Sequence, residues 1–191
     1  TVHDESVISQ YFDFQFRPIQ NLYSTVGLRS DDHTAAGRKT SGRTTLAYQL
    51  DGNSKIRSSL GAGVRFPALY DYKYGSSTVL AKGSSYDDLQ SERGLSFDLG
   101  YDTYLDDLDL GIGITYFKTK TKNPLVSNAR TEWVMRNANG INTSEGIELD
   151  GNWKPVNKKI DLNFSYTFTD SFDAATCDPE ERRSYSDNEC R

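Results

Sequence analysis

The sequence has no apolar run approaching the roughly 20 residues that a membrane-spanning helix requires. Only 36% of its 191 residues are hydrophobic, and the mean hydropathy is -0.67. Apolar side chains are therefore in short supply for the core of a water-soluble domain of this length. This shortage does not exclude a membrane protein, because a strand of a transmembrane barrel crosses with about 9–11 residues of alternating character.

Clusters of basic residues are lacking too. Lys and Arg number 22 against 27 Asp and Glu, which gives a formal net charge of -5. Nucleic-acid binding requires clustered cations that neutralise phosphates, so we expect no nucleic-acid partner. The first residues, Thr1 to Glu5, show neither the basic start nor the apolar segment of a signal peptide, and no initiator Met. We expect either a mature secreted protein or an internal fragment.

Only two cysteines and two histidines are present. Cys177 and Cys190 lie close together in a polar segment, which favours a disulfide that closes a surface loop in an oxidising compartment; two unrelated thiols are the alternative. Neither His3 nor His33 is near them in sequence, so no metal site is expected. No local arrangement of Ser, His and Asp suggests a nucleophile and its base. We therefore expect no enzyme, no catalytic residue and no cofactor.

Alternation of apolar and polar residues dominates the rest of the sequence. Between Lys159 and Thr169, every second residue is Ile, Leu, Phe or Tyr, and the residues between them are polar. Side chains of a strand point to opposite faces in turn, so this segment predicts a strand with one apolar face. No segment has a helical period, and we expect an all-β fold of about nine strands. The same alternation occurs at Tyr11–Arg17, Leu22–Ser30, Arg43–Leu50, Ile56–Phe66, Gly94–Tyr104, Leu108–Phe117 and Gly146–Trp153.

Short and long connections between the predicted strands alternate along the chain. This arrangement is typical of an antiparallel up-and-down transmembrane barrel, with tight turns on the periplasmic rim and long loops outside. Short turns are expected at Pro18–Asn21, Asp51–Ser54, Asp106–Asp107 and Pro155–Lys158, and long loops at Asp31–Ser41, Pro67–Glu92, Thr121–Asn142 and from Asp170 onward.

The polar faces of these strands carry charges, which fit a hydrated lumen or a solvent-facing sheet surface and not a sealed core. Gly61 and Gly63 lie within a strand with no helix after them, so they do not form a phosphate loop; we expect them to relieve crowding on the lumen face. The charged residues are Arg57, Arg65, Asp98, Asp102, Asp109, Glu148, Asp150 and Asp161.

Several segments, in this order, resemble TonB-dependent outer-membrane receptors. They are Ser58–Tyr70, Leu89–Gly100, Ile114–Lys118 with Lys122–Leu125, and Asn139–Leu149. Ser91 departs from the resemblance, because the family's strand opening usually has Pro there. Within the family the chain is most like the cobalamin transporters, since Arg29–His33 followed by Gly37 and Arg38 is similar to a stretch of them.

The resemblance implies a barrel of about 22 strands around a plugged lumen, in the outer membrane of a Gram-negative bacterium. Residues 1–191 would form a partial barrel domain, without the plug domain, the TonB box and the closing strands. The implied function is TonB-dependent uptake of a large scarce ligand, either cobalamin or a ferric siderophore. The implied partners are that ligand, outer-membrane lipid, and the TonB complex through the missing N-terminal part.

Two groups of residues are candidates for ligand contact. Asp31, Asp32 and His33 fall in a predicted external loop, where clustered carboxylates suit a substrate or a divalent cation; a solvated loop is the alternative. Tyr70, Tyr72 and Tyr74 alternate and would stack on a bulky ligand. They would equally suit a continuing strand or an aromatic girdle at the membrane interface. No metal ligand is transferred from the family.

Two other functions remain open at this point. A passive porin or structural barrel would show the same strands but would have neither plug nor TonB box. A soluble β-sandwich that binds a ligand would also show alternating strands, but it would fold without detergent or lipid, whereas a barrel section exposes an apolar face and open edges.

Overall fold

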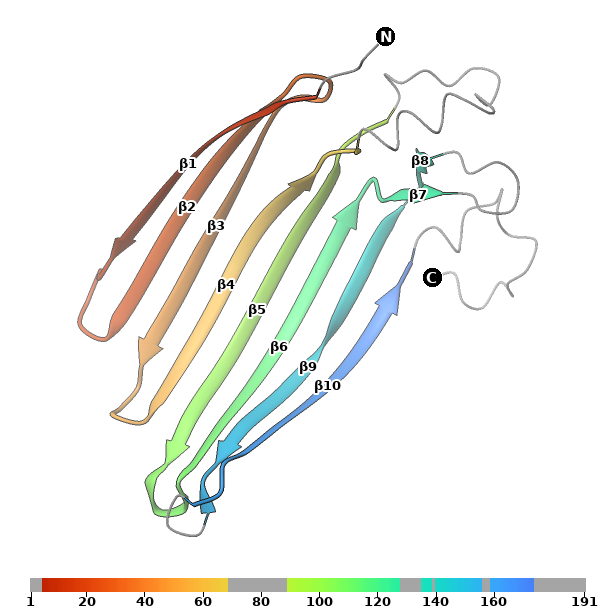
Figure 1. Ribbon diagram of the computed structural model, residues 1–191. Coiled ribbons are helices and arrows are strands. Elements are labelled where there is room, and N and C mark those ends of the chain that lie inside the picture. The colour runs from red at the N-terminus through yellow and green to blue at the C-terminus, as the bar shows by residue number, and fades with distance from the viewer. Residues whose placement is uncertain (1–4, 69–88, 128–134, 139, 156–158, 174–191) are drawn as a thin grey trace, which may run out of the picture.

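Most of the chain forms a single curved antiparallel sheet of eight strands (Figure 1). The computed structural model describes residues 5–68, 89–127, 135–138, 140–155 and 159–173. In the sheet, each strand pairs with its neighbours in sequence, except that β6 pairs with β9 across a separate short pair, β7 and β8. This order confirms the predicted all-β up-and-down fold. The strands of the sheet are β1 (Val7–Phe16), β2 (Leu22–His33), β3 (Gly37–Gln49), β4 (Ser54–Arg65), β5 (Glu92–Leu105), β6 (Leu110–Lys122), β9 (Ile141–Trp153) and β10 (Leu162–Phe172).

The connections sort to the two ends of the sheet. Tight turns join β1 to β2, β3 to β4 and β5 to β6 at its lower end in Figure 1. The last of these contains a short 3-10 helix, η2 (Asp106–Leu108). The strand ends that the long connections join lie at the opposite end, and the connection between β6 and β9 contains β7 (Leu125–Ser127) and β8 (Met135–Asn137). Of the predicted turn at Pro155–Lys158, residues 156–158 lie outside the described residues.

One face of the sheet is apolar and uncovered. A row of paired residues crosses seven strands on this face, and Ile114 and Tyr166 within it are 47% and 65% exposed. Among the described residues, the buried apolar side chains are few, namely Leu125, Ala138, Pro67 and Pro124. A soluble β-sandwich needs a second sheet packed on the first, and within the described residues only the short pair of β7 and β8 lies outside this sheet, which speaks against that alternative. The row is Leu22, Tyr48, Ile56, Tyr101, Ile114, Leu149 and Tyr166.

Charges are confined to one end of this apolar face. On β5, the residues that share the face between Leu95 and Leu105 are uncharged, and the next one outward is Arg93. Ten steps of about 3.4 Å, tilted by about 40°, give a band about 26 Å tall, which matches the apolar band of about 25 Å in outer-membrane barrels. The height of the apolar face therefore fits a bilayer.

The predicted external loop at Asp31–Ser41 is wrong. Strand β2 continues to His33 and β3 starts at Gly37, so only three residues connect them. Beyond the lipid both faces of a strand are wet, so the alternation of polarity stops although backbone pairing continues. Asp32 and Arg38 are paired residues of this extension and form an ion pair of 2.8 Å.

The alternation also gave a wrong position for Phe66. It was expected on the apolar face of a strand ending at Phe66, but β4 ends at Arg65. The Phe66 ring instead stacks on His33, with 4.7 Å between ring centroids.

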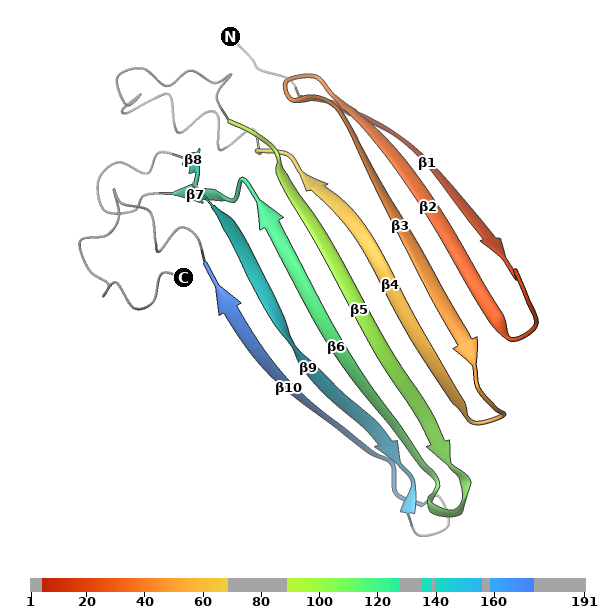
Figure 2. The ribbon, with the colours of Figure 1, turned by 180° about the vertical axis from the view of Figure 1, so that it is seen from behind.

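The sheet does not close on itself in the part of the chain that is described. Strands β1 and β10 each have a neighbour on one side only, and Figure 2 shows from behind that they form the two opposite edges of the curved sheet. Eight strands therefore form a section of a wall, against the nine or so expected. Within these described ranges, no helix is long and apolar enough to cross a membrane.

The turn between β3 and β4 depends on Asp51. Its Oδ1 accepts hydrogen bonds from the backbone N–H groups of Asn53, at 2.8 Å, and of Ser54, at 2.7 Å. The hydrogen bond from Asn53, assisted by those from Ser54, lowers the pKa of Asp51 against the opposing effect of burial. The charged carboxylate therefore stabilises the turn.

We expect Asp51→Ala to destabilise the full-length protein at neutral pH and to have little effect in acid. Because the folded pKa is lowered, the stabilisation is present above the unfolded pKa of about 3.9 and is lost as the pH falls through the folded value. Free energies of unfolding of both proteins, measured by urea titration between about pH 2 and 6, check this. Asp107→Ala in the neighbouring turn is the control, and a pH-independent difference for Asp51→Ala would contradict the explanation.

We expect Leu99→Arg to cost about 2–4 kcal/mol in the folding of the full-length protein into lipid vesicles, because Leu99 lies mid-way along the apolar face of β5. Ser96→Arg places the same side chain on the opposite face of the same strand and should cost far less. Urea titrations in vesicles measure both. Equal costs would show that the two faces do not differ in lipid contact.

Candidate functional site

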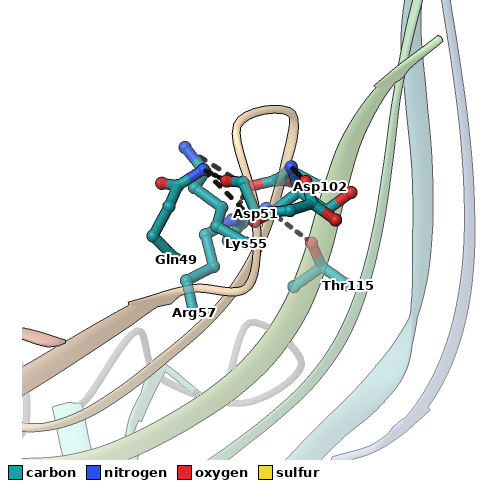
Figure 3. Close-up of polar contacts among 7 residues, drawn as sticks. Gln49, Asp51, Lys55, Arg57, Asp102 and Thr115 are labelled. Atoms are coloured by element: carbon teal, nitrogen blue, oxygen red, sulfur yellow. Dashed lines mark hydrogen bonds and ion pairs between the residues drawn. The ribbon is translucent and has the colours of Figure 1, made fainter. Parts of the chain in front are cut away.

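The polar face of the sheet is concave and carries the charged residues (Figure 3). Register places Lys55 beside Asp102, and Arg57 beside Gly100 and then Thr115. These residues come from three adjacent strands, β4, β5 and β6, near the end with the tight turns. Side chains that are up to 60 residues apart in sequence are thereby brought to one patch.

Arg57 links the three strands. Its Nε donates to Oδ2 of Asp102 at 2.9 Å, and a terminal nitrogen donates to Oγ1 of Thr115 at 2.8 Å. Nζ of Lys55 lies 3.5 Å from the same carboxylate oxygen (Figure 3). Lys55, Arg57, Asp102 and Thr115 are called the Arg57 cluster below. The Thr115 side chain is buried, whereas Arg57 and Asp102 are partly exposed, so the cluster lines a hydrated surface.

A glycine on the middle strand makes room for Arg57. A Cβ added at Gly100 would lie 2.8 Å from Cζ of Arg57, so any side chain there would displace the guanidinium group. The same arrangement recurs at Gly27, over which Arg43 reaches Asp13 at 3.2 Å. Side chains two strands apart thus meet over a glycine on the strand between them.

Gly61 and Gly63 do not have the predicted role. A Cβ at Gly63 would meet nothing within 4 Å, and one at Gly61 would meet only Cβ of Arg43 at 3.7 Å. The expectation that they relieve crowding is therefore wrong. Crowding depends on which long side chain lies on the next strand, and that follows from register.

Asp31, Asp32 and His33 do not converge on one site. Asp31 and His33 share the polar face, and Asp32 lies on the other with Arg38. Asp31 is buried and accepts hydrogen bonds from Ser9 and Arg29.

The buried His33 is held by its local contacts. Its Nδ1 accepts the backbone N–H groups of Ala35 and Ala36 at 3.1 Å each, in addition to the ring contact with Phe66. Ligand contact by the three residues stays a prediction. The contacts that Asp31 and His33 make in the structure are with other residues of this chain. Tyr70, Tyr72 and Tyr74 lie outside the described residues, as do Cys177 and Cys190.

An unpredicted set of amides joins the bases of the two long connections. Oδ1 of Asn137 accepts the backbone N–H of Gln90 at 2.7 Å, and Nδ2 of Asn137 donates to the carbonyls of Gln90 and Asn123, each at 2.8 Å. The side chain of Asn123 donates to that of Gln90 at 3.0 Å. No local sequence pattern predicts these contacts, because they join residues up to 47 positions apart.

Comparisons with known proteins identify the family to which this curved sheet belongs. The family described as "TonB dependent receptor-like, beta-barrel" matches residues 2–188. No curated protein sequence matches the chain. Among solved structures, the siderophore receptor PirA from Pseudomonas aeruginosa superposes with a TM-score of 0.72 at 21% identity, over 87% of this chain and 32% of that one.

Two further solved structures are similar. The FrpB iron transporter from Neisseria meningitidis has a TM-score of 0.69 at 18% identity, over 87% of this chain and 26% of its own. A ferric enterobactin receptor, PfeA, from Pseudomonas aeruginosa has a TM-score of 0.66 at 19% identity, with the same coverage. At these identities the structures show the fold alone, and the chain spans a third or less of their length.

The family match covers nearly the whole chain, and the curved sheet, its uncovered apolar band and its charged concave face are those of a barrel wall. The chain therefore belongs to the TonB-dependent receptor-like β-barrel family, whose members lie in the outer membrane of Gram-negative bacteria.

Proposed function

We propose that this chain forms part of the wall of a receptor that takes up a ferric siderophore across the outer membrane with energy from the TonB complex. The observation that carries the proposal is the family match over residues 2–188. The similar solved structures named above are a siderophore receptor, an iron transporter and a ferric enterobactin receptor, which favours a ferric siderophore as the ligand. Cobalamin is therefore the second candidate ligand, supported by the stretch at Arg29–Arg38 alone.

The two ends of the wall suit different tasks in such a receptor. Ligand would be captured beyond the lumen face at the end away from the tight turns, and Tyr70, Tyr72 and Tyr74 are the residues predicted for that contact. At the end with the tight turns, the Arg57 cluster presents fixed charges to the lumen, where a plug domain would make polar contacts. The hydrogen bonds among Gln90, Asn123 and Asn137 would hold the bases of two external loops together while ligand binds.

A passive porin is the competing function for the same wall. Its lumen is also polar and charged. The two functions differ in energy coupling and in saturation, because a receptor binds a ligand before it transports it, whereas a pore conducts solutes in proportion to their concentration.

We expect the full-length protein to give saturable uptake of iron supplied as a ferric siderophore, and this uptake to disappear when the TonB complex is deleted. Radioactive iron uptake into cells that lack their other siderophore receptors measures both properties. Radioactive cobalamin is assayed in parallel. Uptake of cobalamin and not of iron would show that the ligand is cobalamin, while the proposal of TonB-dependent transport would stand. Unsaturable uptake independent of TonB would favour the porin.

We expect Gly100→Ala to push the guanidinium of Arg57 away from Asp102 and Thr115. The lost hydrogen bonds should cost about 1 kcal/mol of folding free energy. Gly94→Ala is the matched control, since Gly94 lies on the same face of β5 and a Cβ there would meet nothing within 4 Å. Urea titration of the full-length variants gives the difference, and equal stabilities of the two variants would show that Arg57 moves without cost.

A further inference from the structure

The outward face of β6 changes from apolar to basic at its outer end. Ile112, Ile114 and Tyr116 are followed on the same face by Lys118, Lys120 and Lys122, because alternate residues of a strand share a face. Arg93 on β5 is the paired neighbour of Lys122. The four cations lie at the end of the sheet away from the tight turns (Figure 1). Arg93, Lys118, Lys120 and Lys122 are called the basic patch.

The basic patch borders the lipid band directly. Lys118 is paired with Phe97 and Lys120 with Leu95, both of which are exposed apolar residues. Lysine stems lie along apolar surface while their ammonium groups reach polar surroundings. The hydroxyl of Tyr116 donates to Glu145 at 3.1 Å, as expected of an aromatic residue at the membrane interface. The ammonium groups are thus placed at the level of lipid headgroups.

Most of the positive charge in the patch is unpaired. Lys118 forms an ion pair with Glu145. Arg93, Lys120 and Lys122 are exposed and have no hydrogen bond or ion pair with any residue of the described ranges. The acidic residues facing outward beside the patch are Glu145 and its paired neighbour Asp170. Four cations therefore stand against two carboxylates, on a face that the barrel lumen does not reach.

We propose that the basic patch binds the phosphorylated headgroup of a lipid in the outer leaflet of the outer membrane. Lysines two residues apart on a strand are separated by about 7 Å, so neighbouring ammonium groups can contact one phosphate or two phosphates of one headgroup. A phosphomonoester offers several charged acceptors to each ammonium group. This site is on the opposite face from any transported ligand and does not depend on which ligand the receptor carries.

The test uses the full-length protein in detergent, titrated with diphosphoryl lipid A and, separately, with the same lipid after removal of its phosphates. Native mass spectrometry reports the bound lipid. We expect the wild-type protein to prefer the phosphorylated lipid. We expect Lys120→Gln/Lys122→Gln to lose about 10-fold or more of that affinity, since each cation near an anionic lipid surface contributes several-fold.

Two matched variants control the experiment. Lys154→Gln/Lys159→Gln removes the same charge at the opposite rim and should bind as the wild type does, and Lys120→Arg/Lys122→Arg should retain binding. Unchanged affinity of the Lys120→Gln/Lys122→Gln variant, or equal binding of both lipids by the wild type, would overturn the proposal. The wild-type comparison stands on its own if that variant fails to fold. Siderophore uptake is measured separately, so the two proposals fail independently.

Discussion

Lipid offers no hydrogen-bonding partner to a peptide group, so every backbone N–H and C=O of a strand in the membrane must pair with a neighbouring strand. Strand β6 is paired with β9 along all 13 of its residues, and with β5 along the same 13 residues. Because side chains alternate with a period of two, this pairing fixes the face of every residue. A slip of one residue would turn Ile114 into the lumen and Thr115 into lipid. The apolar band and the charged face both follow from the ladder.

Local alternation was enough to predict the strands and their order where one face meets lipid and the other meets water. The segment from Lys159 to Thr169 identified β10 within three residues at each end. The same signal failed at the outer ends of β2 and β3, where no lipid imposes a difference between the faces. Polar strand and polar loop look alike in sequence, and only pairing distinguishes them.

The arrangement of the site was much less predictable than the strands. The individual charges, Arg57 and Asp102 among them, were identified as members of polar faces. That Arg57 crosses Gly100 to reach Thr115 depends on the register between three strands, which no single segment encodes. The glycines singled out from the sequence, Gly61 and Gly63, were the wrong ones for the same reason. Asn137 was missed because its partners are backbone groups, which any residue supplies.

The free-energy cost of placing a charge in lipid determines the charge pattern of the wall more than the stability that ion pairs contribute. A partly exposed pair such as Arg57 with Asp102 contributes only about 0–1 kcal/mol. An Arg or Lys on the lipid face at mid-membrane would cost about 2–4 kcal/mol. The penalty exceeds the gain, so the strands accept charge on the concave face and exclude it from the band. On the outward face, charges on described strands appear only at the outer end, at Asp32, Arg38, Arg93, Lys118, Lys120, Lys122, Glu145 and Asp170.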